Sequence, residues 1–150
     1  MTVSRDDVNN PLSSFSRHGF VLDGKEWPSA EHYFQAMKFE DADYQEEIRS
    51  ADHPKKARKL GRKKRRKIRE DWGKVRTVMM TRALYTKFRT HPEVAELLLQ
   101  SGDIHIQETT LYDYFWGTGR DGRGKNMYGQ VLMNIRDKLK QEQAAANKPG

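Results

Sequence analysis

Residues Trp27–Phe39, WPSAEHYFQAMKF, decide how the chain folds, because they predict a helix that is apolar on two sides. Ser29 is a favourable helix start, since its hydroxyl can accept a hydrogen bond from a free amide of the first turn. On a helical wheel, Glu31, Gln35 and Lys38 fall between the two apolar sides, within a sector about 60° wide. We therefore expect the fold to enclose this helix and to give the polar sector a cleft, a partner charge or water.

The carboxylate of Glu31 has two interpretations at this point. It can form one edge of a structural ion-pair network, or it can point into a pocket and act on a substrate. Glu31 also lies in the first turn of the predicted helix, where the helix dipole favours an ionised carboxylate. The residues alone leave both interpretations open.

The composition excludes several classes of protein. The chain has 150 residues, which is typical of one domain, and it has no cysteine. A disulfide scaffold, a thiol nucleophile and a cysteine-based zinc site are therefore excluded, and a reducing cytoplasm is favoured. The amino-terminal residues MTVSRDDVNNPLSS lack the apolar segment of a secretory signal, and no apolar run approaches the ~20 residues of a membrane span.

The remaining sequence predicts an α+β fold that is mostly helical, with a small β element. Residues 20–27 read as a β-hairpin around Asp23-Gly24, a favoured two-residue turn. Apolar periodicity and end signals predict the other elements: helices over 43–49, 54–61 and 72–89, from 91 and from 127, and a short strand at 104–106. We expect a flexible segment over residues 1–10, one domain over 11–142 and a flexible tail over 143–150.

The basic charge of the chain is local. Residues 55–69, KKARKLGRKKRRKIR, hold 11 of the 28 Lys and Arg residues, whereas the rest of the chain has 17 basic and 21 acidic residues. Such a run can neutralise nucleic-acid phosphates, but it lacks the interleaved aromatic residues of single-strand binders. We favour a solvated helical face with one or two arginines turned inward toward a substrate phosphate.

A second group of polar residues follows in the glycine-rich segment. Residues 119–126, GRDGRGKN, approach a phosphate-binding loop, but Asn126 cannot replace the hydroxyl that holds magnesium there. A nucleoside triphosphatase is therefore rejected, while an anion cradle and a plain surface loop both remain open. Upstream, Glu108 and Asp113 stand among aromatic residues, a setting that suits a planar ring and a developing positive charge, or a core cluster with solvated acids.

The chain resembles the NADAR family, also called the YbiA-like family. Four blocks carry the resemblance: WPSAEHYFQAMKF (27–39), KKARKLGR (55–62), WGKVRTVMMTRALYTKF (72–88) and ETTLYDYFWGTGRDGRGKNMYGQVLMNIRDKL (108–139). Their order and spacing hold over residues 11–139. The sequence departs from the family pattern at Ser14, where an asparagine is expected.

The resemblance implies an N-glycosidase, a hydrolase of N-glycosyl bonds. The expected substrates are the phosphorylated ribosylaminopyrimidines of riboflavin biosynthesis, and the expected product is ribose 5-phosphate. Cleavage of such a bond builds positive charge on the sugar, which a nearby carboxylate stabilises, and a carboxylate can also orient or deprotonate water. Arginines bind phosphate through paired hydrogen bonds.

These requirements select the expected site residues. Glu31 is the expected catalytic carboxylate, and Asp113 and Glu108 are next, for sugar hydroxyls or water. The expected substrate-binding residues are Gln35, Lys38, Tyr33, Arg62, Trp116, Gly117, Lys125 and Asn126. We expect no metal and no cofactor, since the histidines show no ligand spacing.

Two alternatives remain open. The chain can be an ADP-ribosyl-guanine hydrolase acting on modified nucleic acid, with residues 55–69 facing the nucleic acid. It can also be a non-catalytic module that binds ADP-ribose or nucleic acid. In each case we expect a cytoplasmic protein without a membrane partner, and the sequence leaves the oligomeric state open.

Overall fold

Six helices and two small sheets make up the computed structural model, which describes residues 1–147. The helices are α1 (Ala30–Ala36), α2 (Ala42–Arg49), α3 (Pro54–Gly61), α4 (Trp72–Thr90), α5 (Pro92–Gln100) and α6 (Met127–Ala146). The strands are β1 (Thr2–Val3), β2 (Phe20–Leu22), β3 (Lys25–Trp27) and β4 (Gln107–Glu108). The predicted mostly helical α+β fold is confirmed.

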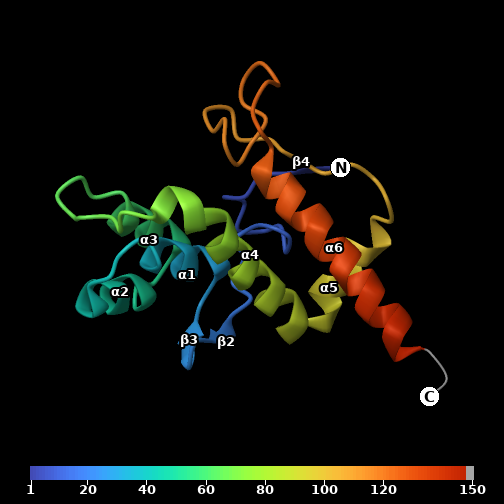
Figure 1. Ribbon diagram of the computed structural model, residues 1–150, viewed down its shortest axis with the longest axis horizontal. Helices are drawn as coiled ribbons and strands as arrows, with labels where there is room; N and C mark the ends of the chain where they lie inside the picture. The colour runs from blue at the N-terminus through green and yellow to red at the C-terminus, as the bar shows by residue number, and fades with distance from the viewer. Residues whose placement is uncertain (148–150) are drawn as a thin grey trace.

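Helix α1 lies at the centre of one half of the molecule. It packs against α2, α3 and α4, and all of its residues are buried. In Figure 1, α4 runs between the group formed by α1, α2 and α3 and the group formed by α5 and α6. The predicted cap is present, since the Ser29 hydroxyl accepts from the His32 amide at 3.2 Å. The enclosed helix expected from its two apolar sides is therefore observed.

The hairpin β2–β3 forms as predicted. Phe20 pairs with Trp27 and Leu22 pairs with Lys25 in an antiparallel register. Asp23 and Gly24 have φ angles of 54° and 76°, as a type I′ turn requires. The hairpin is fixed to α1, because the Tyr33 hydroxyl donates to the Asp23 carboxylate at 2.8 Å.

The amino-terminal residues differ from the flexible segment expected over 1–10. Residues Thr2–Val3 form β1, which pairs in parallel with β4, 105 positions along the chain from Thr2 to Gln107. Val3 and Arg5 are 2% and 3% exposed. The sequence of this segment shows no periodicity that would predict a strand. The strand forms because its partner β4 lies far away in the sequence. The predicted strand at 104–106 is shifted to Gln107–Glu108 for the same reason.

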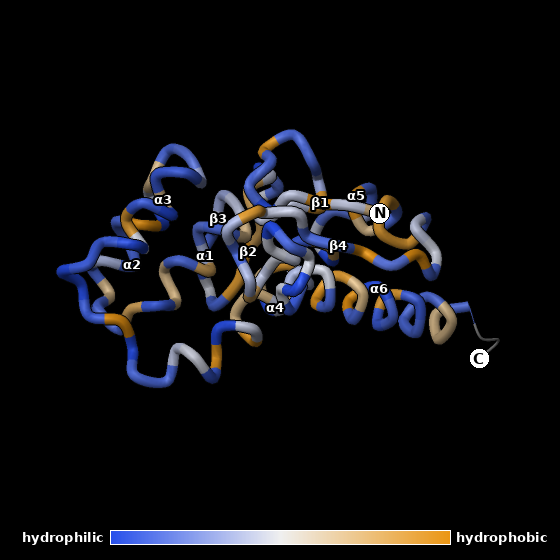
Figure 2. Tube along the Cα trace, turned by 90° about the horizontal axis from the view of Figure 1, so that it is seen from above, coloured by the Kyte–Doolittle hydropathy of each residue, from blue (hydrophilic) through white to orange (hydrophobic). Residues whose placement is uncertain are grey.

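Helix α6 also extends further than expected. It continues to Ala146, past residue 143 where the flexible tail was expected to begin. Glu142 accepts hydrogen bonds from Tyr85 and from Arg89, both on α4, and these bonds hold the last turns. In Figure 2 hydrophobic and hydrophilic residues alternate along α6, as in a helix with one face on the core. The rest of the predicted tail, residues 148–150, lies outside the described residues.

Candidate active site

Glu31 lies at the centre of a buried polar cluster. Its Oε2 atom accepts from the Ser14 hydroxyl at 2.7 Å and from the Arg5 guanidinium at 3.1 Å. Its Oε1 atom accepts from the Gln35 amide at 2.7 Å and from Arg58 Nε at 3.3 Å. We call Arg5, Ser14, Glu31, Gln35 and Arg58 the Glu31 cluster. The four donors come from the amino-terminal segment, α1 and α3, so the cluster joins three parts of the chain.

The cluster keeps Glu31 ionised. Burial, the largest influence, raises the pKa of this carboxyl. The guanidiniums of Arg5 and Arg58 and the hydrogen bonds from Gln35 and Ser14 lower it by more, and the pKa of Glu31 falls to about 2. A full negative charge is therefore held inside the fold at neutral pH.

The segment that carries Ser14 is itself fixed on both sides. The Ser14 carbonyl accepts from the Glu31 amide at 3.0 Å, and the Ser13 carbonyl accepts from the buried Lys87 amine at 2.8 Å. The serine that replaces the expected asparagine therefore contributes a hydroxyl that contacts Glu31 directly.

A cavity of about 210 Å³ opens beside this cluster. We call it the Lys38 cavity. Its walls come from the amino-terminal segment, α1, α4, the residue after α3 and the loop before α6, and its lining residues are Arg5, Phe34, Gln35, Lys38, Arg62, Trp72, Arg76, Asp113, Phe115 and Trp116. Four of the predicted substrate-binding residues therefore meet in one place: Gln35, Lys38, Arg62 and Trp116.

Glu31 stands behind the wall of the Lys38 cavity. It is 0% exposed, and Arg5 and Gln35, which bind its two oxygens, form the wall in front of it. Asp113 instead lines the cavity and is 22% exposed. Glu31 is therefore a buried carboxylate that binds its neighbours, whereas Asp113 is a carboxylate that a ligand in the cavity can contact.

Asp113 keeps one oxygen available. Its Oδ1 atom accepts from the backbone amides of Phe115 and Trp116 at 3.0 and 2.8 Å, which fix the side chain at the turn. Its Oδ2 atom lies 3.8 Å from Arg5, a distance longer than a hydrogen bond. That oxygen can accept a hydrogen bond from a sugar hydroxyl or a water molecule.

Two arginines of the cavity have no carboxylate partner among residues 1–147. Neither Arg62 nor Arg76 takes part in an ion pair in this part of the chain. The Arg76 guanidinium stacks on the Phe115 ring, with 3.3 Å from Cζ to the ring centroid, and its buried Nε has no hydrogen-bond partner. Unpaired guanidiniums in a cavity favour an anionic ligand, above all a phosphate.

Lys38 has an amine with unusual acid–base properties. Burial lowers its pKa most, the nearby charge of Glu31 raises it, and the guanidiniums of Arg62, Arg5 and Arg58 lower it further, to about 8. A sizeable fraction of the amine is therefore neutral slightly above physiological pH, and a neutral amine can accept a proton.

The remaining predicted site residues do not line the Lys38 cavity. Glu108 accepts from the Arg5 amide at 2.8 Å and from the Thr110 amide at 2.7 Å. Asn126 donates to the Ile106 carbonyl at 2.8 Å, and a Cβ on Gly117 would lie 2.5 Å from Glu108. These contacts build the loop that carries Asp113. Tyr33 is bound to Asp23, and the exposed Lys125 lies outside the lining.

Three arginines of the site were not singled out from the sequence: Arg5, Arg58 and Arg76. Arg5 stands in a segment without periodicity, and Arg58 is one cation within the basic run, so no local signal separated them from solvated residues. Arg76 did carry a sequence signal, because it lies one helical turn after Trp72 and therefore on the same face of the predicted helix. In the structure both side chains line the cavity.

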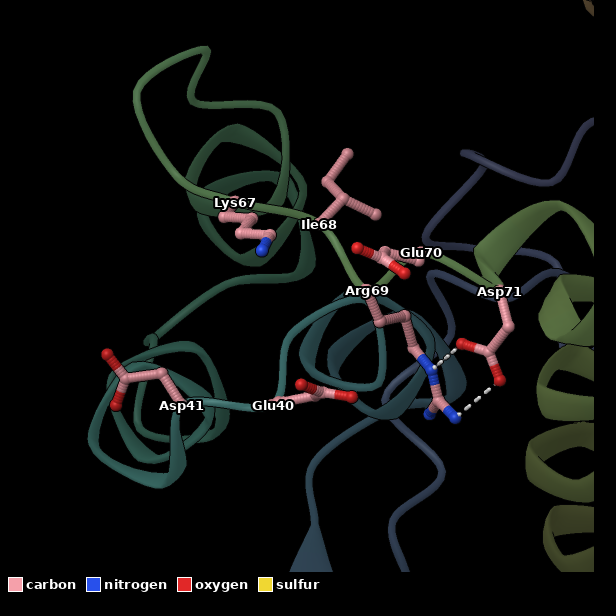
Figure 3. A pocket seen from close by; sticks show the side chains of 7 residues that line it. All are labelled: Glu40, Asp41, Lys67, Ile68, Arg69, Glu70 and Asp71. Atoms are coloured by element: carbon pink, nitrogen blue, oxygen red, sulfur yellow. Dashed lines mark hydrogen bonds and ion pairs between the residues drawn. The ribbon is translucent and has the colours of Figure 1, made fainter.

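A larger cavity elsewhere contains none of the predicted site residues. It measures about 650 Å³ and lies between the start of α2 and residues 67–71. Figure 3 shows its mixed charges, among which Arg69 is bound to Asp71 by two hydrogen bonds of 2.6 and 3.0 Å. Opposite charges that neutralise each other make it a weaker candidate than the Lys38 cavity.

The described part of the chain has neither a metal-binding cluster nor a membrane-spanning helix. No three His, Asp or Glu side chains of residues 1–147 come together in a way that would hold a metal ion. None of the helices there has the length and apolar character needed to cross a bilayer.

Comparison with known proteins decides the family. The model of the NADAR domain matches residues 3–140. The chain belongs to the NADAR domain family. The resemblance found in the four sequence blocks is therefore confirmed.

Individual proteins that resemble the chain in sequence and in structure support this assignment. N-glycosidase YbiA of Escherichia coli is 40% identical over 136 residues, which cover 91% of this chain and 85% of that protein. A riboflavin biosynthesis protein of Vibrio vulnificus is 37% identical over 142 residues, 95% of this chain but 38% of that protein. The NMR structure of E. coli YbiA matches with a TM-score of 0.88 and 37% identity, covering 100% of this chain and 89% of that one. The prediction of an enzyme acting on N-glycosyl bonds is confirmed by these relatives.

Replacement of Glu31 by Gln is expected to destabilise the fold, because two buried guanidiniums lose their counter-charge. Breaking a buried ion pair on one side typically costs about 3–5 kcal/mol. The contribution of Glu31 exists above its ordinary pKa of 4.5 and is lost as the pH falls toward 2. Urea unfolding at pH 7 should show the loss in Glu31→Gln and little change in the control Glu96→Gln, an exposed residue of α5. Equal stability of the two variants would contradict the structural role of the cluster.

Proposed function

We propose that the chain hydrolyses the N-glycosidic bond of a phosphorylated ribosylaminopyrimidine of riboflavin biosynthesis and releases ribose 5-phosphate. One observation carries the proposal: a single cavity brings together two unpaired arginines, a carboxylate with a free oxygen and a lysine of lowered pKa. Relatives named as an N-glycosidase and as a riboflavin biosynthesis protein support the reaction and the pathway.

The phosphate of the substrate binds between Arg62 and Arg76. These two cations approach from different elements, the residue after α3 and the first turns of α4, so they can hold one phosphate from two sides. Charge-assisted hydrogen bonds to both guanidiniums replace the partners that the arginines lack in the protein. Stacking on Phe115 holds the Arg76 plane in place before the substrate arrives.

The cavity holds part of the substrate. Its volume of about 210 Å³ is below the ~300–1,000 Å³ typical of ligand pockets. The sugar phosphate occupies it, and the pyrimidine reaches toward the mouth. Trp116 is 4% exposed and packs edge-on against Phe34 and Phe115, so it forms a wall of the cavity.

Asp113 and Lys38 share the chemical step. As the bond to the base breaks, positive charge develops on the sugar, and the Asp113 carboxylate stabilises it and accepts from a ribose hydroxyl. The neutral Lys38 amine accepts a proton of the attacking water, whose oxygen bonds to C1 of the ribose, and passes a proton to the departing nitrogen of the base, which leaves with the electrons of the broken bond. Glu31 acts through its neighbours: it holds Arg5 and fixes the Gln35 amide, and thereby shapes the wall that faces the sugar.

The substrate is identified by a panel of compounds. We expect free ribose 5-phosphate from a ribosylaminopyrimidine 5′-phosphate, because its phosphate meets Arg62 and Arg76, and much slower release from the dephosphorylated compound. Sugar release is measured by chromatography, with NAD and ADP-ribosylated DNA in parallel. Release of ADP-ribose from the DNA without hydrolysis of the pyrimidine would instead establish the ADP-ribosyl-guanine alternative.

Replacement of Asp113 by Asn is expected to lower kcat by about 10²–10³-fold, the usual cost of removing one group that stabilises transition-state charge. The amide keeps the size of the side chain and one acceptor for the backbone bonds. Asp121→Asn in the same loop is the control, since Asp121 is exposed and lies outside the cavity lining. Unchanged kcat in Asp113→Asn would remove Asp113 from the reaction.

Activity is expected to rise with pH through about 8, because the neutral form of Lys38 is the base and its pKa is lowered to about 8. Lys38→Arg keeps the positive charge but stays protonated, so kcat should fall by about 10²–10⁴-fold, as for the loss of a general base. A pH profile of kcat for the wild type and the variant tests this. A variant that keeps the rate, or a wild-type rate that falls through pH 8, would exclude this role.

A further inference from the structure

A second cavity lies next to the Lys38 cavity, on the side of α3. It measures about 750 Å³, and five cationic side chains line it: Lys55, Arg58, Lys59, Arg62 and Lys63. Asp6 is the one acidic residue of its lining, and Phe15 completes the lining. We call this cavity the α3 groove. Its charge is strongly positive, and it is larger than the cavity assigned to the reaction.

The cations of the α3 groove are arranged in two rows. Lys55, Lys59 and Lys63 follow one another at intervals of four residues, and so do Arg58 and Arg62. Lys55 and Lys59 lie one turn apart on α3, where like charges repel, and α3 has no acidic residue to offset them. Arg62 and Lys63 follow directly after the end of this helix. Among residues 1–147 the three lysines form no ion pair. This arrangement opposes folding of α3 and is relieved when an anion binds.

Two arginines connect the groove to the active site. Arg62 lines both cavities. Arg58 donates to Glu31 through Nε at 3.3 Å, and its Cζ lies 4.3 Å from the centroid of the Phe15 ring. Its Nη1 lies 3.6 Å from the Asp6 carboxylate, and its buried Nη2 has no hydrogen-bond partner. An anion in the groove therefore competes for the guanidiniums that hold Glu31 and meet the substrate phosphate.

The composition of the groove indicates the kind of anion. Binding of a single-stranded nucleic acid relies on aromatic platforms for its bases, but Phe15 is 4% exposed and already covered by Arg58. Lys55 and Lys59 are separated by about 6 Å along the helix axis, so one phosphoryl group satisfies only a subset of the cations. A chain of linked phosphoryl groups can contact the lysine row and the arginine row at the same time, and it needs no aromatic platform for a base.

We propose that the α3 groove binds a linear oligophosphate, either free or as the phosphate chain of a small molecule, and that its occupation inhibits hydrolysis in the Lys38 cavity. Inhibition follows because the bound anion draws Arg58 from Glu31 and Arg62 from the substrate phosphate.

Binding is tested by calorimetry with tripolyphosphate and with inorganic phosphate. We expect tripolyphosphate to bind the wild type more tightly than phosphate, and the double variant Lys59→Gln/Lys63→Gln to weaken that binding by about tenfold or more, since each lost charged contact is worth roughly a factor of ten. Lys74→Gln/Lys138→Gln removes two exposed lysines outside the groove as the matched control. Equal loss in both double variants, or equal binding of the two anions, would overturn the proposal.

Inhibition is tested separately with the substrate that the wild type hydrolyses. Tripolyphosphate should inhibit the wild type, while Lys59→Gln/Lys63→Gln should keep its uninhibited rate and lose most of the inhibition. If the variant is inhibited as strongly as the wild type, the anion acts inside the Lys38 cavity and the groove is not the inhibitory site. Tighter binding of a single-stranded oligonucleotide than of tripolyphosphate through the same lysines would replace the oligophosphate by a nucleic acid. The calorimetric experiment measures binding without substrate turnover, so its result does not depend on whether the proposed reaction is correct.

Discussion

The buried charge of Glu31 is the constraint on which the rest of the structure depends. A carboxylate at 0% exposure is tolerated only because Arg5, Arg58, Ser14 and Gln35 together supply its partners. These donors belong to the amino-terminal segment, to α1 and to α3. The pairing therefore fixes how three distant parts of the chain meet, and two of the donors, Arg5 and Gln35, also line the Lys38 cavity.

The candidate active site is built against this cluster, because Arg5 and Gln35 also line the Lys38 cavity. The charge that holds the fold together lies behind the cavity wall, while the groups with free bonding capacity line the cavity. Asp113 keeps one oxygen available, Arg76 has no carboxylate partner in the described residues, and Lys38 has a pKa of about 8. The buried carboxylate of Glu31 and the partly exposed carboxylate of Asp113 thus differ in burial and in free bonding capacity.

The positive charge of residues 55–69 also has a structural explanation. Arg58 turns inward toward Glu31, the exposed Arg62 lines the Lys38 cavity, and both line the α3 groove together with the neighbouring lysines. The α3 helix and the residues that follow it therefore contribute to the Glu31 cluster, to the Lys38 cavity and to the α3 groove. The expected helical face over residues 55–69 is helical only up to Gly61, and Arg58 turns toward Glu31, while contact of an arginine with a substrate phosphate stays a prediction.

The sequence by itself determined the elements of this protein and about half of the residues that line its candidate site. Periodicity and caps predicted the hairpin and the helices to within a few residues, because these signals are local. Gln35, Lys38, Arg62, Asp113 and Trp116 were singled out from motifs, and all of them line the cavity. Only the tertiary structure decided the burial and the partners of the carboxylates and the order of the amino terminus. Burial and ion pairing depend on residues far apart in the chain. A local sequence pattern therefore cannot show whether a carboxylate is buried behind the lining of the cavity or forms part of that lining.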